Sequence, residues 1–266
     1  MDFQTYILPT YSLHLADNAL ILGHRNSEWT GHGPILEQDI ALSNIALDLV
    51  GHARNFYQYA ATLIDPVKST FATFRNIGTT ITEDHLAYLR DAGEYRNVQL
   101  VEQPNGDWAH TILRQFFFST YQYYLYTDLL KSGDRQLAAI AEKSIKETTY
   151  HLRWSSEWVI RLGDGTTESH ERMLVAISNL EPFTPELFNP APFEKQAAAA
   201  GFGVDPAALK ERWMDKVETI FNEATLQLTK DNFFVTNGKE GFHSEHLSYL
   251  LSEMQFLQRT HPGATW

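Results

Sequence analysis

The chain has 266 residues, 43% of them hydrophobic, and is therefore long enough to bury a core in one large domain or two small ones. Its 33 acidic residues against 21 Lys and Arg give a net charge of −12, which opposes attraction to nucleic acid or anionic lipid. The chain has no cysteine, which excludes disulfides, thiolate metal sites and a cysteine nucleophile.

The N-terminus and the hydropathy pattern predict a cytoplasmic protein without a membrane span. Met1-Asp2-Phe3-Gln4 lacks the basic segment and following apolar run of a signal peptide. The longest uncharged aromatic run, residues 115–127, is shorter than the roughly 20 residues that a membrane helix needs.

Apolar residues recur at helical spacing along the chain, which predicts an all-α fold. The first helix is expected over Thr10–Trp29, because Gly31-His32-Gly33-Pro34 breaks the period after it, with His32 as a turn residue. The second helix is expected over Ile35–Ile64. Its apolar stripe consists of Leu42, Ile45, Leu49, Ala53, Phe56 and Ala60.

Capping residues indicate where the next helices begin. After a looser stretch, Thr82 is expected to cap a helix that reaches Gln103, and Asp107 to cap an aromatic helix to Lys131. The tight link Ser132-Gly133-Asp134 then precedes a long helix that ends at Leu162. Long helices with short connections are typical of an antiparallel helical bundle.

Shorter helices are expected after the bundle, over Glu168–Leu180, 205–228 and Ser244–Arg259. The Pro-rich segment Glu181–Pro192 is the best candidate for a linker. Because two helices rarely form a core of their own, residues 1–266 are expected to form a single domain, with additional C-terminal helices on the bundle.

Two segments each contain part of a di-iron signature. Carboxylate-bridged di-iron bundles take one Glu from each of two helices and a Glu-x-x-His pair from each of the other two. Glu94 and Glu147 could begin such pairs, but the third residues after them are Asn97 and Tyr150, and His151 comes one position late.

Other positions leave two interpretations open. Asp48 and His52 share the i, i+4 spacing of Glu147 and His151, and such a pair can bind metal. The middle of the aromatic helix, however, offers no carboxylate but only Gln115, Ser119 and Gln122.

These residues therefore form either an unusual metal site or a former site filled by polar side chains. In the second case Asn97 or Tyr150 would pair with Glu147. A cation would compensate the buried carboxylate. The candidates are Arg96, Lys143, Lys146 and Arg153.

Three further features have a structural interpretation. His243 and His246 could coordinate a divalent ion, but Ser244 between them is better interpreted as the cap of the last helix. Rings surround the aromatic helix from Phe116 to Tyr126, so some are expected to face another subunit. Tyr150 is expected to be a core phenol.

Several stretches together carry a family resemblance. They are residues 28–32, 44–49, 53–55, 100–106, 136–140, 150–153, 222–226, 243–247, 253–255 and 262–266. With them the chain resembles, over essentially its full length, the PaaC-type structural subunits of the bacterial ring 1,2-phenylacetyl-CoA epoxidase, a multicomponent monooxygenase. Gly93-Glu94 and the connection from Asp65 to Thr82 depart from the pattern.

The resemblance implies a ferritin-like fold and a heteromeric role. A homologous catalytic oxygenase subunit would hold the di-iron site and bind most of the phenylacetyl-CoA, a small subunit would bridge the assembly, and a reductase would deliver electrons. This chain would hold no cofactor and no catalytic residue. The remnant di-iron positions would be Glu94, Asn97, Glu147, Tyr150 and His151.

Further expectations concern assembly. Basic side chains near the subunit boundary are expected to help hold the phosphates of coenzyme A, and the isolated chain could form a homodimer. Two alternatives stay open: a catalytic di-iron protein with an unusual ligand set, and a stand-alone helical binding protein.

Overall fold

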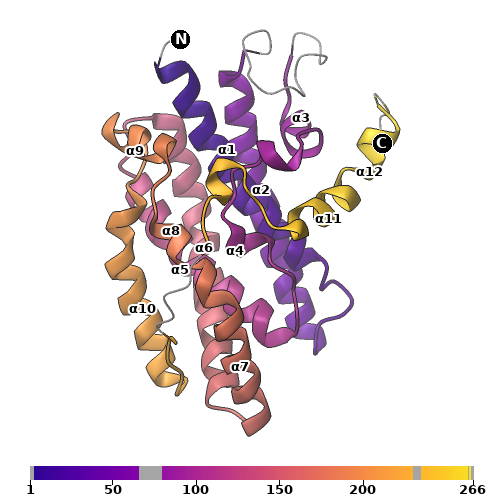
Figure 1. Cartoon of the computed structure of the whole chain (residues 1–266), viewed down its shortest axis with the longest axis vertical. Coiled ribbons are helices and arrows are strands. Elements are labelled where there is room, and N and C mark those ends of the chain that lie inside the picture. The colour runs from indigo at the N-terminus through magenta and orange to yellow at the C-terminus, as the bar shows by residue number, and fades with distance from the viewer. Residues whose placement is uncertain (1–2, 66–79, 230–234, 263, 265–266) are drawn as a thin grey trace.

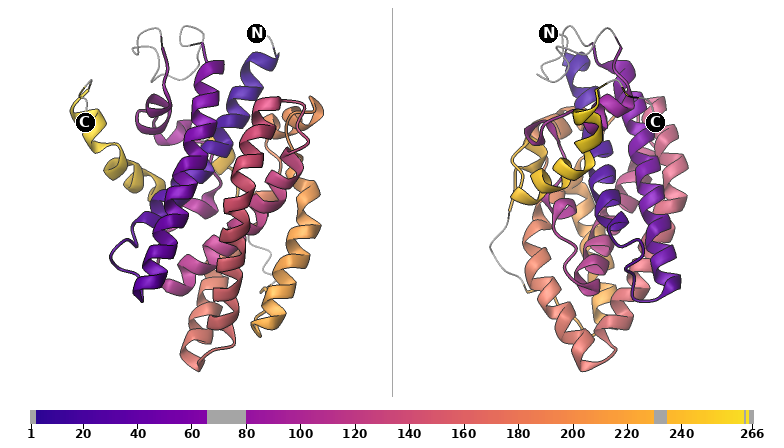
Figure 2. Two further views of the ribbon diagram at one scale, coloured as in Figure 1. Left: turned by 180° about the vertical axis from the view of Figure 1, so that it is seen from behind. Right: turned by 90° about the vertical axis from the view of Figure 1, so that its right-hand side faces the viewer.

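The computed structural model describes residues 3–65, 80–229, 235–262 and 264, with side chains from residue 6 onward. The longest helices are α1 (Phe3–Ser27), α2 (Leu36–Leu63), α5 (Trp108–Leu129) and α6 (Arg135–Gly163). α1 packs along α2, α5 packs along α6, and α2 also contacts α6 (Figure 1; Figure 2). The described part of the chain contains helices, turns and irregular segments but no strand, which confirms the all-α fold.

Local signals explain where the long helices begin. Asp107 accepts a hydrogen bond from the backbone N–H of His110 at 3.0 Å, and Asp134 accepts one from Leu137 at 2.9 Å. Each carboxylate thus satisfies an amide that the first turn leaves unpaired. The predicted stripe of α2 is buried as expected, since each of its side chains is at most 1% exposed. It consists of Leu42, Ile45, Leu49, Ala53, Phe56 and Ala60.

Shorter helices surround this bundle. They are α3 (Glu83–Tyr88), α4 (Gln99–Glu102), α7 (Thr167–Leu180), α8 (Pro185–Phe188), α9 (Pro192–Ala199), α10 (Lys210–Glu223), α11 (Glu245–Met254) and α12 (Phe256–Thr260). Helices α7 and α10 cover α5, and Trp213 packs on Phe117 with ring centroids 5.4 Å apart. Most rings of the aromatic helix are therefore covered by this chain itself and need no second subunit.

The prediction of one helix from Thr82 to Gln103 is wrong. Thr82 does cap a helix, but α3 ends at Tyr88, and an irregular segment separates it from the short α4. Side chains of α1 and α8 bind the backbone of that segment. Asp17 accepts from Arg96 N–H at 2.7 Å, Asn18 from Val98 N–H at 2.9 Å, and Glu186 from Gln99 N–H at 2.7 Å. The predicted connection from Asp65 to Thr82 lies mostly outside the described residues.

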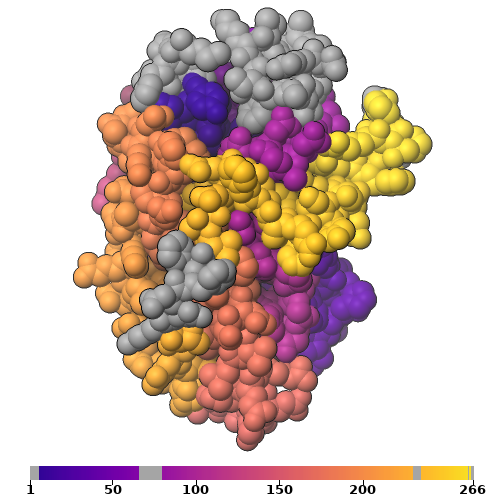
Figure 3. All heavy atoms as spheres, viewed as in Figure 1, coloured from indigo at the N-terminus to yellow at the C-terminus, as the bar shows by residue number. Residues whose placement is uncertain are grey.

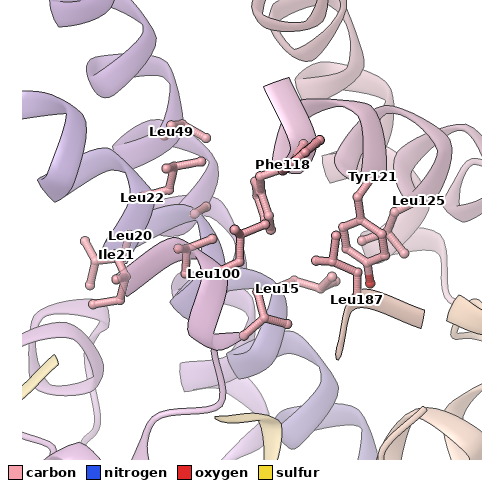
Figure 4. Packing of buried hydrophobic residues seen from close by; sticks show 14 of the residues in the cluster. Leu15, Leu20, Ile21, Leu22, Leu49, Leu100, Phe118, Tyr121, Leu125 and Leu187 are labelled. Atoms are coloured by element: carbon pink, nitrogen blue, oxygen red, sulfur yellow. The ribbon is translucent and has the colours of Figure 1, made fainter. Parts of the chain in front are cut away.

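One continuous cluster of buried apolar side chains joins these elements, from Ile7 to Leu251. Figure 4 shows Leu100 of α4 between leucines of α1 and Phe118 of α5. The segment from 235 to 262 lies across the front of the bundle, and its far end projects beyond it (Figure 3). No helix in the described ranges is long and apolar enough to cross a membrane.

Candidate functional site

The space between the four long helices is where a bundle of this type would hold two metal ions. In this chain the middle of α5 supplies neutral groups there. Asn26 of α1 donates to Gln115 at 2.7 Å, and Gln115 donates to Ser119 at 2.7 Å. All three side chains are fully buried, and each bond joins an amide to a neutral acceptor. This part of the core is therefore polar but uncharged.

Charged groups occur instead where α2 meets α6. His52 Nε2 lies 2.6 Å from Glu147 Oε2, and His151 Nε2 lies 3.0 Å from Asp48 Oδ2. The two imidazole centroids are 6.1 Å apart. The i, i+4 pairs noted in the sequence thus bind each other across two antiparallel helices, and we call these four residues the seam.

The seam is buried on one side and open to solvent on the other. His52 and His151 are 1% and 0% exposed, whereas the side chains of Asp48 and Glu147 are 32% and 40% exposed. Burial lowers the pKa of His151, and its hydrogen bond to Asp48 opposes that shift. The imidazoles therefore link the interior to carboxylates at the surface.

The seam residues do not fit a di-iron centre. Two hard cations need several carboxylate oxygens pointing inward, with one contribution from each of the four helices. Here both carboxylates are bound to imidazole Nε2 atoms, and α5 contributes Gln115 and Ser119. The buried carboxylate of α1, Asp17, accepts from Tyr57 at 2.5 Å and from Arg90 at 3.1 Å and is therefore already paired. No group of three or more His, Cys, Asp or Glu side chains within the described residues is arranged to hold a metal ion.

The five predicted remnant positions do not come together in one cluster. Glu147 and His151 belong to the seam. Glu94 and Asn97 lie outside any long helix, because the predicted helix is interrupted there. Glu94 accepts from the N–H of Asp91 at 2.9 Å, which is a local turn contact.

The expectations for Tyr150 and for the compensating cations are wrong. Tyr150 is 37% exposed and packs under Arg153, so it is not a core phenol. Neither Asn97 nor Tyr150 is the hydrogen-bond partner of Glu147. His52 provides that bond, instead of the cations considered from the sequence.

Asn97 takes part in a second buried cluster that the sequence did not reveal. Glu102 of α4 is 0% exposed and accepts from Asn97 at 2.9 Å, from His243 at 2.8 Å and from the backbone N–H of Ser244 at 2.6 Å. Ser244 is the N-cap residue of α11 as predicted, but its side chain makes no capping bond. His243 thus serves to attach the C-terminal segment to the bundle.

Lys239 strengthens the same attachment. Its ammonium group lies 2.9 Å from Glu194 of α9, and both side chains are at most 3% exposed. The sequence offered no signal for these contacts beyond isolated charged residues in apolar surroundings, because their partners are 45 and 141 positions apart.

Comparison with known proteins identifies relatives of this chain. Residues 4–266 match the family described as "Phenylacetic acid catabolic protein". The chain is also similar to one of the subunits of the 1,2-phenylacetyl-CoA epoxidase of Escherichia coli K12. The two are 46% identical over 259 residues, which cover 97% of this chain and 99% of that relative.

Proposed function

The chain belongs to the phenylacetic acid catabolic protein family, and on that basis we propose that it is the structural subunit of a multicomponent phenylacetyl-CoA 1,2-epoxidase. In this role it packs against a homologous catalytic subunit that holds two irons. It makes and breaks no bond itself.

One observation carries the structural role. A di-iron bundle takes a carboxylate from each of its four helices, but the middle of α5 carries Gln115 and Ser119, which bond to each other and, through Gln115, to Asn26 of α1. Both bonds join neutral groups, so this part of the core needs no metal ion to compensate a buried charge. Glu147 and His151 are then interpreted as a remnant of a ligand set that now fastens α2 to α6.

The chain's own residues supply rigidity. The seam ties α2 to α6, and the Glu102 cluster ties the C-terminal segment to α4. A partner packed on this bundle gains a fixed surface, and catalytic groups must be held to within about 0.5 Å by their surroundings. The contribution to catalysis is therefore to position the partner's helices.

The other components follow from the same proposal. The catalytic subunit binds most of the acyl-CoA substrate, a small subunit bridges the assembly, and a reductase passes electrons from NADPH to the iron. The assembly works in the cytoplasm. This chain contributes no cofactor.

Co-expression with the catalytic subunit tests the role. The purified complex should oxidise phenylacetyl-CoA in an NADPH-dependent assay with the reductase, and the catalytic subunit prepared without this chain should lose that activity. A catalytic subunit that is equally active in the absence of this chain would refute the proposal.

A further inference from the structure

The C-terminal helix α11 packs on the rest of the chain through one face only. Leu247, Leu250 and Leu251 follow the i, i+3, i+4 spacing of a single helix face, and they are 0%, 5% and 4% exposed. Just after α11, the side chain of Gln255 donates to Arg90 O at 2.9 Å. The opposite face of α11 is therefore turned away from the bundle.

That outer face carries large apolar side chains. Tyr249 and Phe256, seven residues apart, are 65% and 61% exposed, and Leu257 beside them is 49% exposed. Phe242, which precedes the N-cap residue of α11, is 68% exposed. Single apolar residues on a surface are ordinary, but a row of them along one segment is typical of an interaction site. We call residues 242, 249, 256 and 257 the outer stripe.

Polar and charged groups flank the outer stripe on both sides. At about 100° per residue, His246 and Glu253 lie on one side of Tyr249. Glu245 and Ser252 lie on its other side. His246 precedes Tyr249 by three residues and Glu253 follows it by four, which corresponds to about 4.5 Å and about 6 Å along the helix axis.

The flanking charges are available to another molecule. No described residue forms an ion pair with Glu245, His246 or Glu253. Arg259 of α12, at the edge of the face, is already paired with Asp91 at 2.9 Å. The face therefore offers two carboxylates and one imidazole without a partner in the described part of the chain.

A second copy of this chain supplies the complement when the two α11 helices run antiparallel. A two-fold axis beside Tyr249 places each residue before Tyr249 opposite the residue equally far after it in the other copy. The two Tyr249 rings then meet at the axis. His246 lies within about 1.5 Å of the height of Glu253 of the second copy, on the same side, and can donate an imidazole N–H to it. Phe242 lies at the end where the second copy has Phe256.

No like charges meet in this arrangement. The two Glu253 side chains lie about 12 Å apart along the axis, beyond the Debye length of about 8 Å at physiological salt. Glu245 is on the other flank, where it faces Ser252 of the second copy. A parallel pairing, in contrast, would set Glu253 against Glu253 and His246 against His246. The charges therefore select the antiparallel pairing.

From these observations we infer that the outer stripe is a self-complementary surface through which two copies of this chain form an antiparallel dimer. Tyr249 lies at the two-fold axis, and His246 pairs with Glu253 of the second copy on each side of it. Figure 3 shows the segment from 235 to 262 at the surface of the bundle, where its outer face is accessible. The inference goes beyond the proposed function and does not depend on it.

The size of the surface predicts a weak dimer. Three rings of roughly 200 Å² each, exposed by about two-thirds, give on the order of 400 Å² of apolar area per copy. Two copies with their flanking polar groups thus bury on the order of 1,000 Å², which is near the lower limit of specific interfaces. The dimer should therefore form reversibly as the concentration rises.

Sedimentation equilibrium of the purified full chain, without any other subunit, tests the inference. The parent is expected to show a monomer–dimer equilibrium at concentrations up to about 1 mM. Tyr249→Asp places two carboxylates at the axis and should raise Kd by at least about 100-fold. The matched control is Val175→Asp on the exposed side of α7, which should leave Kd within about 3-fold.

An exchange of charges tests the register. His246→Glu sets carboxylates against Glu253 of the second copy, and Glu253→His sets imidazoles against His246, so each should raise Kd by about 10-fold. The double variant with both changes restores two pairs of the same kind and should return Kd to within about 3-fold of the parent. Circular dichroism verifies that each variant is folded.

Three results would overturn the inference. The first is a parent that stays monomeric at every concentration, and the second is a dimer that Tyr249→Asp leaves intact. The third is a double variant that associates no better than His246→Glu or Glu253→His alone, because the antiparallel register requires the rescue. The proposed function is unaffected by any of these results, since the catalytic subunit takes no part in the measurement.

Discussion

Glu102 shows how a single carboxylate can determine the position of a distant segment. Its two oxygens accept bonds from Asn97, His243 and the N–H of Ser244, and none of its surface is exposed. Removing one member of such a buried network leaves the other polar groups without partners. The stability of the C-terminal attachment therefore depends on this residue.

Glu102→Ala is expected to lower the free energy of unfolding by about 3 kcal/mol, because three donors lose their acceptor in a buried site. Urea denaturation measures the change. Glu102→Gln keeps an acceptor oxygen and should cost less. An alanine variant as stable as the parent would mean that these bonds contribute little.

A second prediction at the residue scale concerns pH. Burial lowers the pKa of His24 from 6.5 to about 4. The folded chain therefore binds fewer protons than the unfolded chain between these values, and stability falls as the pH falls through this window. His24→Gln should reduce the loss of unfolding free energy between pH 6.5 and 5 by on the order of 1 kcal/mol. If His24→Gln leaves the pH dependence of the unfolding free energy unchanged, His24 is not a cause of the loss of stability at low pH.

At the scale of elements, α2, α5 and α6 could be predicted, whereas the segment from Tyr88 to Gln99 could not. The start of α1 was also wrong, because the helix begins at Phe3 and continues through Pro9 instead of beginning at Thr10. Apolar period and capping residues are local signals, and they placed α2, α5 and α6 to within about two residues. The interrupted segment is set by distant side chains, Asp17, Asn18 and Glu186, which bind its backbone N–H groups. The spacing of apolar residues along the sequence does not show that distant side chains will bind backbone N–H groups that a helix would otherwise use.

Two glycines make a matched test of helix packing. Gly51→Ala should raise the free energy of unfolding of the isolated chain by about 1 kcal/mol, because the helix gains a better former and the added Cβ meets nothing. At Gly163 an added Cβ would lie 2.4 Å from Ala224 O, so Gly163→Ala should destabilise the chain by about 2 kcal/mol. In thermal unfolding, Gly51→Ala should have a higher melting temperature than the parent, and Gly163→Ala a lower one. The same sign for both would show that helix propensity or packing has been misjudged.

The candidate site was predictable only in part, for a related reason. The sequence showed that α5 lacks a carboxylate, and it showed the i, i+4 spacing of Asp48 with His52 and of Glu147 with His151. It did not show that the two pairs bind each other, since that depends on the antiparallel register of α2 and α6. It also placed Glu94 and Asn97 on a helix that does not exist.

At the scale of the whole molecule, contacts within the chain itself satisfy most of the polar groups that the bundle buries. Its core combines apolar side chains, neutral polar pairs such as Asn26 with Gln115, and buried ion pairs such as Asp17 with Arg90 and Glu194 with Lys239. Residues 4–266 match the family of phenylacetic acid catabolic proteins, so this core is that of a member of the family.

The most direct test of the central claim is the iron content of the folded chain expressed alone in iron-replete cells, measured by mass spectrometry of the metal. A supporting subunit in which the middle of α5 offers Gln115 and Ser119 instead of a carboxylate is expected to contain iron far below one ion per chain, with a cooperative unfolding transition that chelators leave unchanged. Close to two irons per chain, removed only with loss of structure, would contradict the account and identify this chain as a catalytic di-iron protein.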